Sequence, residues 1–334
     1  MPLIRDRERV IEVFEEAAER GRVLVDFNSE NQSCTEAILS AAREFGESID
    51  EPDLPIIVGI TNLYWHRPQA TLYSHSRRWE TGLRMFLDDL EILCEPDSPW
   101  SDLRVMVHLD HIQWDQDRDL LQWDMDQFSS VMYDASTLSF EENIARTARF
   151  VQKQGDKIYV EGACDEIKEG EEKGADMQLT TPDQAARYAD RTGVDLMVAN
   201  VGTEHRAAGA DRHYERDLAR SISERVNTGL CLHGTSSVPA EQLGTLFGDG
   251  IRKVNVWTAL ERDSSPALLL DMLRNAARVA GPDRAKRWAE KGLLGPDADL
   301  NSPPSLDHYT TTYRQNIVFE EMKDVVKQYL KLWY

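Results

Sequence analysis

The sequence lacks a surplus of basic residues. It has 38 lysines and arginines against 59 acidic residues, which gives a formal net charge of −21 at pH 7. A protein that follows the phosphate backbone of a nucleic acid needs a basic stripe, and no such stripe is present. Binding to an anionic membrane surface is disfavoured for the same reason. We therefore expect neither a nucleic acid nor a membrane among the partners of this chain.

Cysteines and long apolar runs are also scarce. The chain has four cysteines, which are scattered without the paired spacing of a metal site: Cys34, Cys94, Cys164 and Cys231. In a chain of 334 residues this pattern predicts reduced, packed thiols rather than a disulfide framework. Residues 1–21 have the pattern of a charged amphipathic helix and lack the apolar stretch of a signal peptide. We therefore expect a cytoplasmic protein.

Eight short apolar runs alternate with segments of helical periodicity. The hydrophobic content of 41% is sufficient for a large core. The runs, each read as a strand, are 22–28, 55–61, 103–110, 130–134, 157–161, 196–201, 229–233 and 251–256. Helices are predicted between them at 34–45, 78–94, 116–127, 140–154 and 182–191. Repeated strand–helix units of this kind predict an α/β fold, the (β/α)8 TIM barrel, with extra helices at both ends.

The expected organisation is one barrel domain over residues 1–334. Residues 22–260 would form the barrel core and 261–334 a C-terminal helical extension. Within that extension, 264–280 is predicted to be helical, and 292–305 is interrupted too often by proline and glycine for regular structure. Residues 319–333 form an amphipathic helix that would pack on the barrel or on a partner subunit.

Polar side chains stand at the ends of most predicted strands. In a TIM barrel the active site lies where the carboxyl ends of the strands meet, so these positions favour function. They are Asn28, Asp110, His111, Asp134, Glu161, His205, His233 and Asn255. His111, His205 and His233 follow three different strands, and three such imidazoles could hold a catalytic zinc ion with one open position.

Asp110 and His111 present a geometric question. Neighbouring residues of a strand point to opposite faces, but beyond the strand end both could turn into one cleft. Taken alone, such a pair favours a solvated aspartate and a packed histidine at a strand end, and it is the polar residues at the other strand ends that favour a functional site. His108 lies inside the strand and is predicted to be packed or to lie behind the ligands rather than to be a ligand. The remaining histidines are expected to be structural or on the surface: His66, His75, His213 and His308.

Two turns after the last strands favour an anionic ligand. The segment 233–237 combines a glycine with three hydroxyl side chains, and 255–258 follows the eighth strand. The corresponding loops of TIM barrels often bind phosphate through backbone N–H groups and hydroxyls. Each segment by itself is equally an ordinary turn.

At these residues the sequence resembles the class II, zinc-dependent family of fructose-bisphosphate and tagatose-bisphosphate aldolases. The resemblance covers about residues 23–260 and includes five segments in the order of the family: HLDH at 108–111, SVMYDAS at 130–136, the stretch ending in VGTEH at 205, LCLHGTSS at 230–237, and GIRKVNVWTAL at 250–260. It implies cleavage or formation of a phosphorylated ketose through an enediolate.

The resemblance also implies residue roles. Zinc would be the cofactor, held by His111, His205 and His233, with a second divalent or a monovalent cation as an open alternative. Asp110 would exchange a proton with the substrate hydroxyl, and Asp134 and Glu161 would lie behind the ligands or at a second metal. The ketose phosphate would contact Asn28, Gly202, Gly234, Ser236, Asn255 and Thr258. Glu172 is a candidate for proton transfer at carbon, although a solvated loop acid fits equally.

The sequence departs from the family pattern around the substrate. Ala163 replaces a second glutamate, Arg206 replaces a glycine, Trp257 replaces a small or acidic residue, and the aromatic-rich segment 64–79 is unusual. Arg206 and Trp257 predict a reshaped pocket whose substrate is a sugar-phosphate-like compound other than fructose 1,6-bisphosphate. A homodimer or homotetramer is expected. A zinc hydrolase on the same barrel and a metal-binding, non-catalytic homologue with an assembly or regulatory role remain the alternatives.

Overall fold

The computed structural model describes residues 3–167, 179–204 and 213–334. Its centre is a parallel sheet with the strand order β1-β4-β3-β2-β9-β8-β7-β6-β5. Because β4 pairs with both β3 and β5, strands β2 to β9 close into an eight-stranded barrel. The strands are β1 Leu3–Ile4, β2 Leu24–Asn28, β3 Pro55–Thr61, β4 Arg104–Gln113, β5 Ser130–Asp134, β6 Tyr159–Ala163, β7 Leu196–Val198, β8 Gly229–Leu232 and β9 Ile251–Val256. The predicted TIM barrel is confirmed.

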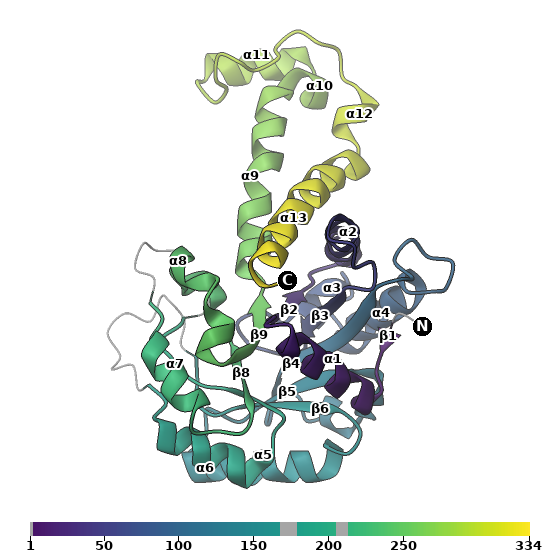
Figure 1. Ribbon diagram of the computed structural model, residues 1–334. Helices are drawn as coiled ribbons and strands as arrows, with labels where there is room; N and C mark the ends of the chain where they lie inside the picture. The colour runs from purple at the N-terminus through teal and green to yellow at the C-terminus, as the bar shows by residue number, and fades with distance from the viewer. Residues whose placement is uncertain (1–2, 168–178, 205–212) are drawn as a thin grey trace.

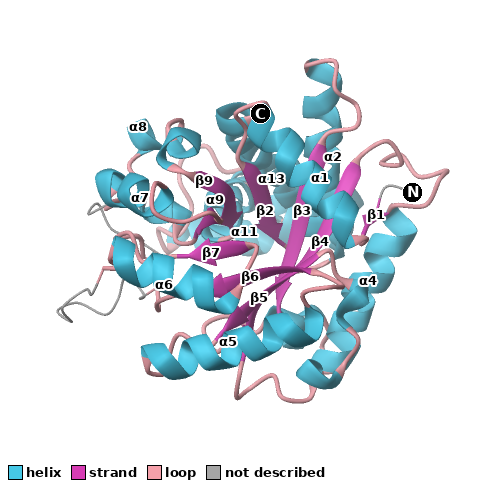
Figure 2. Cartoon of the chain, turned by 60° about the horizontal axis from the view of Figure 1, so that its bottom comes forward, coloured by secondary structure: helices cyan, strands magenta, loops and turns pink. Residues whose placement is uncertain are grey.

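Helices surround the barrel and cover the outer face of the sheet (Figures 1 and 2). The longer ones that pack around it are α1 Arg7–Glu19, α2 Gln32–Ser48, α4 Trp79–Leu93, α5 Phe140–Gln154, α6 Pro182–Thr192 and α7 Arg216–Ser223. The shorter helices and 3-10 turns are α3 Gln69–Tyr73, α8 Ala240–Leu243, η1 Leu120–Gln122, η2 Met125–Gln127, η3 Thr235–Ser237 and η4 Leu246–Asp249. Helices cover the outer face of the strands and side chains fill the interior of the barrel. Strands β2, β3 and β5 are therefore buried along their whole length.

The N-terminal mouth of the barrel is closed by α1. Val10, Val13 and Phe14 of this helix form one buried cluster with the first residues of several strands, and the Phe14 ring stacks on Tyr159 with centroids 4.6 Å apart. The charged amphipathic pattern of the N-terminal segment therefore reflects a helix that plugs the barrel. The opposite mouth, where the strands end, is the open one.

The C-terminal part of the chain forms a helical arm that projects from the barrel (Figure 1). It consists of α9 Thr258–Arg274, α10 Ala276–Ala280, α11 Pro282–Glu290, α12 Leu306–Tyr309 and α13 Thr311–Trp333. Helix α13 returns to the barrel and packs against α2 and α9. There the Trp333 indole donates to the Leu243 carbonyl at 2.7 Å and the Tyr334 hydroxyl to the Pro55 carbonyl at 2.9 Å.

One predicted helix, 116–127, was wrong. Two 3-10 turns occupy this stretch, because the Asp117 carboxylate binds local backbone in place of helix formation. It accepts the Gln113 N–H at 2.8 Å and the Leu63 N–H at 3.3 Å, and it also accepts from the Asn62 amide at 2.7 Å. The loop is thereby fastened to the end of β3.

The expected reduced thiols are confirmed, since all four cysteines are buried and free. None of the helices in the described ranges is both long enough and apolar enough to cross a membrane.

Candidate functional site

A bulge in β4 brings Asp110 and His111 to the same side. The register of β4 against β5 shifts between Leu109 and Ile112, and His111 has a φ of 48°, in the left-handed region that non-glycine residues seldom adopt. Such a backbone costs about 1–3 kcal/mol and is retained mainly at functional positions. The sequence reading placed the turn beyond the end of the strand. The strand in fact continues to Gln113, and the bulge performs the reorientation.

Asp110, His111 and His233 form a buried group at the open mouth. One potential ligand atom from each lies within 4.8 Å of the others. The rings of His111 and His233 are 4.9 Å apart and nearly perpendicular, at 88°. The Asp110 Oδ1 atom is buried and has no hydrogen-bond partner among the described residues. Two imidazoles and a carboxylate in this arrangement match the donor types that zinc prefers.

Each histidine of this group is oriented by a carboxylate on its far side. Nδ1 of His111 is 2.9 Å from Asp134 Oδ2, while the other Asp134 oxygen accepts the Ser136 hydroxyl at 2.6 Å. Nε2 of His233 is 3.0 Å from Glu161 Oε1. Carboxylates that hold the second ring nitrogen in this way fix the orientation of metal-binding histidines. The contacts engage Nδ1 of His111 and Nε2 of His233, which leaves Nε2 of His111 and Nδ1 of His233 as the nitrogens that could hold a metal.

Lys253 is buried beneath the two histidines, in the interior of the barrel. Its Nζ lies 3.0 Å from Glu161 Oε2, 2.6 Å from Asn255 Oδ1 and 3.3 Å from Asp26 Oδ2. The predicted packed histidine, His108, lies here too, 3.3 Å from Lys253 Nζ and 2.8 Å from the Ser130 hydroxyl. The Lys253 ammonium group thus offsets the negative charge of the Glu161 and Asp26 carboxylates, which are buried away from water. Glu161 belongs to the middle of β6 and is part of this network, rather than standing at a strand end as expected.

The electrostatics of the group favour an ionised Asp110. Burial raises the pKa of this carboxyl, but the surrounding imidazoles, His111 first, outweigh burial and hold the pKa well below its usual range. For His111 the two effects have the opposite signs. Burial lowers its pKa, and the carboxylates of Asp110 and Asp134 outweigh burial and raise the pKa above the ordinary value. The site therefore attracts positive charge, which a divalent cation would supply in place of a proton.

Asn28, at the end of β2, connects to Asp110. Its side-chain amide donates to Asp110 Oδ2 at 2.7 Å. The neighbouring residue of β3 is Gly59, and a Cβ atom there would lie 2.2 Å from Asn28 Oδ1 and 2.4 Å from Asp26 Oδ1. The absence of a side chain at position 59 therefore makes room for the amide that orients Asp110.

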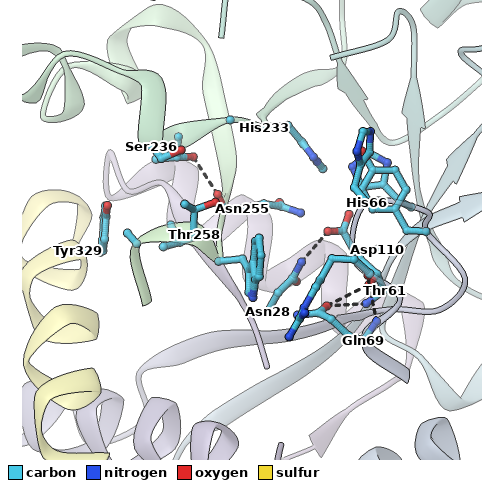
Figure 3. A pocket seen from close by; sticks show the side chains of 18 residues that line it. Asn28, Thr61, His66, Gln69, Asp110, His233, Ser236, Asn255, Thr258 and Tyr329 are labelled. Atoms are coloured by element: carbon cyan, nitrogen blue, oxygen red, sulfur yellow. Dashed lines mark hydrogen bonds between the residues drawn. The ribbon is translucent and has the colours of Figure 1, made fainter. Parts of the chain in front are cut away.

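A pocket opens from this group toward the turns after β8 and β9 (Figure 3). Its lining includes the predicted substrate residues Asn28, Gly234, Ser236, Asn255, Trp257 and Thr258. Gly234 has a φ of 69°, and a Cβ there would meet the Glu204 backbone at 2.6 Å. The turn is held by the Thr235 hydroxyl, which donates to the Asn255 carbonyl at 2.9 Å. Gly202, also predicted, packs instead against His213 and is not among the described lining residues.

The first turn of α9 adds backbone donors to this end of the pocket. Its N-cap residue, Trp257, makes no side-chain capping bond to the helix, and Thr258 and Ala259 line the pocket. The first N–H groups of a helix have no partner within the helix and carry a partial positive charge. This end can therefore accept an anionic group such as a phosphate.

Three predicted site residues, His205, Arg206 and Glu172, lie outside the described residues. Several lining residues were missed by the sequence reading: Thr61, Tyr64, His66, Arg67, Gln69 and Tyr329. The Tyr64 ring stacks on His111 with centroids 4.1 Å apart, and His66, expected to be structural or on the surface, also lines the pocket. The rule of polar strand ends, applied to 55–61, would have named Thr61. No comparable signal pointed to Tyr329, which comes from α13.

Comparison with known proteins identifies the family of the chain. The family model described as fructose-bisphosphate aldolase class-II matches residues 8–333. A sulfofructosephosphate aldolase of Alkalicoccus urumqiensis is 34% identical over 167 residues, 47% of this chain and 55% of that protein. The uncharacterized protein YdjI of Escherichia coli K12 is 29% identical over 178 residues, 49% of this chain and 64% of YdjI. The chain thus matches less than two thirds of the length of either relative.

Solved structures show the same fold. A fructose-bisphosphate aldolase from Campylobacter jejuni superposes with a TM-score of 0.75 at 18% identity, over 99% of this chain and 95% of the other. The YdjI aldolase from E. coli K12 gives a TM-score of 0.63 at 20% identity, over 96% and 94% of the two chains. Since the family model covers nearly the whole sequence, the chain belongs to the class II fructose-bisphosphate aldolase family.

Proposed function

We propose that this chain is a zinc-dependent aldolase that cleaves or forms a carbon–carbon bond of a phosphorylated ketose. The observation that carries the proposal is the convergence of Asp110, His111 and His233 at the open end of the barrel. His111 and His233 would hold the zinc ion together with His205. When bound, zinc would act as a Lewis acid on the ketone of the substrate.

Asp110 is the proposed acid and base for the substrate hydroxyl at the bond that breaks. Its depressed pKa keeps it ionised, which a base requires, and the Asn28 amide fixes its orientation. Glu172 is proposed to transfer the proton at carbon. Asp134 and Glu161 position the histidines rather than contact the substrate.

The substrate phosphate is proposed to bind where backbone donors collect. Gly234, Ser236 and Thr258 line that end of the pocket beside the first turn of α9. Asn255, which accepts from Lys253 and lines the pocket, would connect the phosphate end to the metal end. Gly202 and Arg206 complete the proposed substrate contacts.

We further propose that the natural substrate is not fructose 1,6-bisphosphate. Trp257 lines the pocket and takes up volume there, as the sequence departures predict. The relative from A. urumqiensis is named for a sulfonated ketose phosphate, which is compatible with a family member adapted to another end group. A cytoplasmic homodimer or homotetramer, built from one barrel domain with its helical extension, completes the proposal.

The test is turnover with controlled metal content. The full chain is stripped with a chelator, reloaded with zinc, and assayed for cleavage of fructose bisphosphate, tagatose bisphosphate, single-phosphate ketoses and a sulfonated ketose phosphate. We expect activity that disappears with the metal and returns with zinc. A protein that binds zinc tightly and cleaves none of these compounds would refute the proposal and favour the non-catalytic alternative.

A further inference from the structure

Arg67 is the single lysine or arginine among the described residues that line the pocket. It lies in the loop between β3 and α3, within the segment 64–79 whose composition departs from the family pattern. Its side chain keeps 38% of its surface exposed. The described lining therefore offers one permanent cationic side chain to a substrate, and its surroundings determine what that cation can bind.

Arg67 is held in place by Glu30, whose side chain is only 8% exposed. Glu30 Oε1 accepts Arg67 Nε at 2.9 Å, Gln69 Nε2 at 3.0 Å and the Trp257 indole N–H at 2.7 Å, and Oε2 accepts Arg67 Nη2. The guanidinium also lies 5.5 Å from the centre of the Trp257 ring. We call Glu30, Arg67, Gln69 and Trp257 the Arg67 wall.

In the Arg67 wall the side-chain acceptors are already engaged, while a guanidinium donor is not. Both Glu30 oxygens are engaged by donors, and the Gln69 oxygen accepts the Thr61 N–H at 2.9 Å. Nη1 of Arg67 donates to no acceptor within the described residues, and it forms a planar edge together with Nη2. Such an edge suits two oxygens of one oxyanion, which it can bind through parallel hydrogen bonds.

The charge of the Arg67 wall limits the negative charge that the bound oxyanion can carry. Glu30 balances the guanidinium, and the Glu261 carboxylate is close enough to interact electrostatically with Arg67. Attraction to one guanidinium grows in proportion to the charge of the ligand, whereas the cost of removing an ion from water grows with the square of that charge. A singly charged group is therefore favoured over a phosphate dianion.

Within the Arg67 wall, Gln69 and the Arg67 carbonyl, which accepts the Thr61 hydroxyl and the Gln69 N–H, lie across the pocket from the phosphate end, whereas Trp257 directly precedes Thr258 of that end. Figure 3 shows Ser236, Thr258 and Tyr329 on one side and Thr61 and Gln69 on the other, with Asn28 and Asn255 between them. A ketose phosphate bound at the metal with its phosphate at the turns would extend its other end toward the wall.

We propose that Arg67 binds a singly charged oxyanion, a sulfonate or a carboxylate, at the end of the substrate remote from the phosphate. This inference rests on the proposed aldolase function and names the substrate class of the same site. It assigns selectivity to Arg67, which no sequence motif of the family indicated.

The experiment compares substrates that differ only at the far end. The zinc-loaded chain is assayed with fructose 1-phosphate and with its 6-sulfonate, 6-carboxylate and 6-phosphate counterparts. In the wild type we expect kcat/KM for the sulfonate or the carboxylate to exceed that for the hydroxyl by about 10- to 100-fold, the usual effect of a charge-assisted hydrogen-bond pair. The sulfonate and carboxylate arms identify which oxyanion is preferred.

Arg67→Met should reduce that ratio to near one, and Arg67→Lys, which keeps the charge but not the planar edge, should give an intermediate ratio. The lysine variant gives the same information if the methionine variant fails to fold. The matched control is Arg78→Met, since Arg78 has 71% of its side chain exposed and does not line the pocket. An unchanged ratio in both Arg67 variants, or a wild-type preference for the bisphosphate, would overturn the inference.

Equilibrium binding of sulfoacetate, followed by saturation-transfer NMR, separates this inference from the proposed function. If no ketose phosphate is cleaved but sulfoacetate binds the wild type and not Arg67→Met, the aldolase function fails and the oxyanion site stands. If sulfoacetate does not bind the wild type, or binds both proteins equally, the oxyanion site fails irrespective of turnover.

Discussion

The metal end of the pocket and the Arg67 wall are built in different ways. Asp110 and His111 belong to strand β4, His233 follows β8, and the network of buried charges beneath them is rooted in barrel strands. The members of the Arg67 wall come from the segments that follow β2, β3 and β9. Strands are fixed by their neighbours on both sides, whereas loops can change sequence without disturbing the sheet. The difference indicates that the proposed chemistry and the proposed choice of substrate are carried by separable parts of the fold.

Removal of a metal ligand should have the largest effect on zinc content and turnover, and this effect should be confined to the metal end. We expect about one zinc per chain in the wild type, and loss of both zinc and turnover in His233→Ala and His111→Ala. Elemental analysis and steady-state kinetics measure these two quantities. His213→Ala, an exposed histidine paired with Glu215, should keep its zinc. Full zinc content in the first two variants would contradict the site.

Lys253→Met tests whether the metal end depends on the buried charges below it. The substitution leaves Glu161 and Asp26 without their cation, and breaking a buried pair in this way costs about 3–5 kcal/mol. Urea unfolding should show this loss, together with weaker zinc binding through the displaced His233. Lys157→Met, at an exposed lysine, is the control. A variant as stable as the wild type would show that Lys253 does not hold the site.

Asp110→Asn should separate metal binding from proton transfer. Asparagine is nearly isosteric, so zinc and fold should persist while turnover falls by about 10²-fold, as expected for loss of a positioned base. Asp115→Asn, an exposed carboxylate in the following loop, provides the comparison. Near-normal activity in Asp110→Asn would transfer the proton step to another carboxylate, such as Glu172.

Trp257→Phe should have the smallest effect and should act on the Arg67 wall alone. It removes the indole donor to Glu30, a contact of 2.7 Å, and a hydrogen bond to a charged group contributes about 1.5–3 kcal/mol. Because two other side chains still hold Glu30, we expect the lower part of that range. KM for a substrate that carries the far-end oxyanion should rise about tenfold, and the zinc content should not change. Trp288→Phe in the helical arm should alter neither KM nor zinc content. Loss of zinc in Trp257→Phe would contradict the separation of the two ends.

The sequence allowed the barrel and part of the site to be predicted because both follow from local patterns. Apolar runs such as 55–61 coincide with the observed strand, and the rule of polar strand ends identified Asp110, His111 and His233. The helix at 116–127 was wrong because periodicity does not reveal that Asp117 binds backbone across the loop.

The remainder depends on contacts between residues distant in sequence. Glu30 and Trp257 are 227 positions apart, so nothing local indicates that one accepts from the other. The left-handed backbone at His111 is also unpredictable from its residue type, because histidine seldom adopts it and only the register of β4 against β5 imposes it. Of the site residues that were missed, Tyr64, His66 and Arg67 lie in the loop after β3, and Tyr329 reaches the pocket from the distant helix α13.

Gly59 sets a condition on the evolution of this chain. It neither lines the pocket nor carries a functional group, yet any side chain there would collide with Asn28 and Asp26. A duplicated copy could therefore keep every catalytic residue and still lose activity through one replacement at a position that a survey of active-site residues would ignore. Position 59 would be among the first places to look for drift in an inactive descendant.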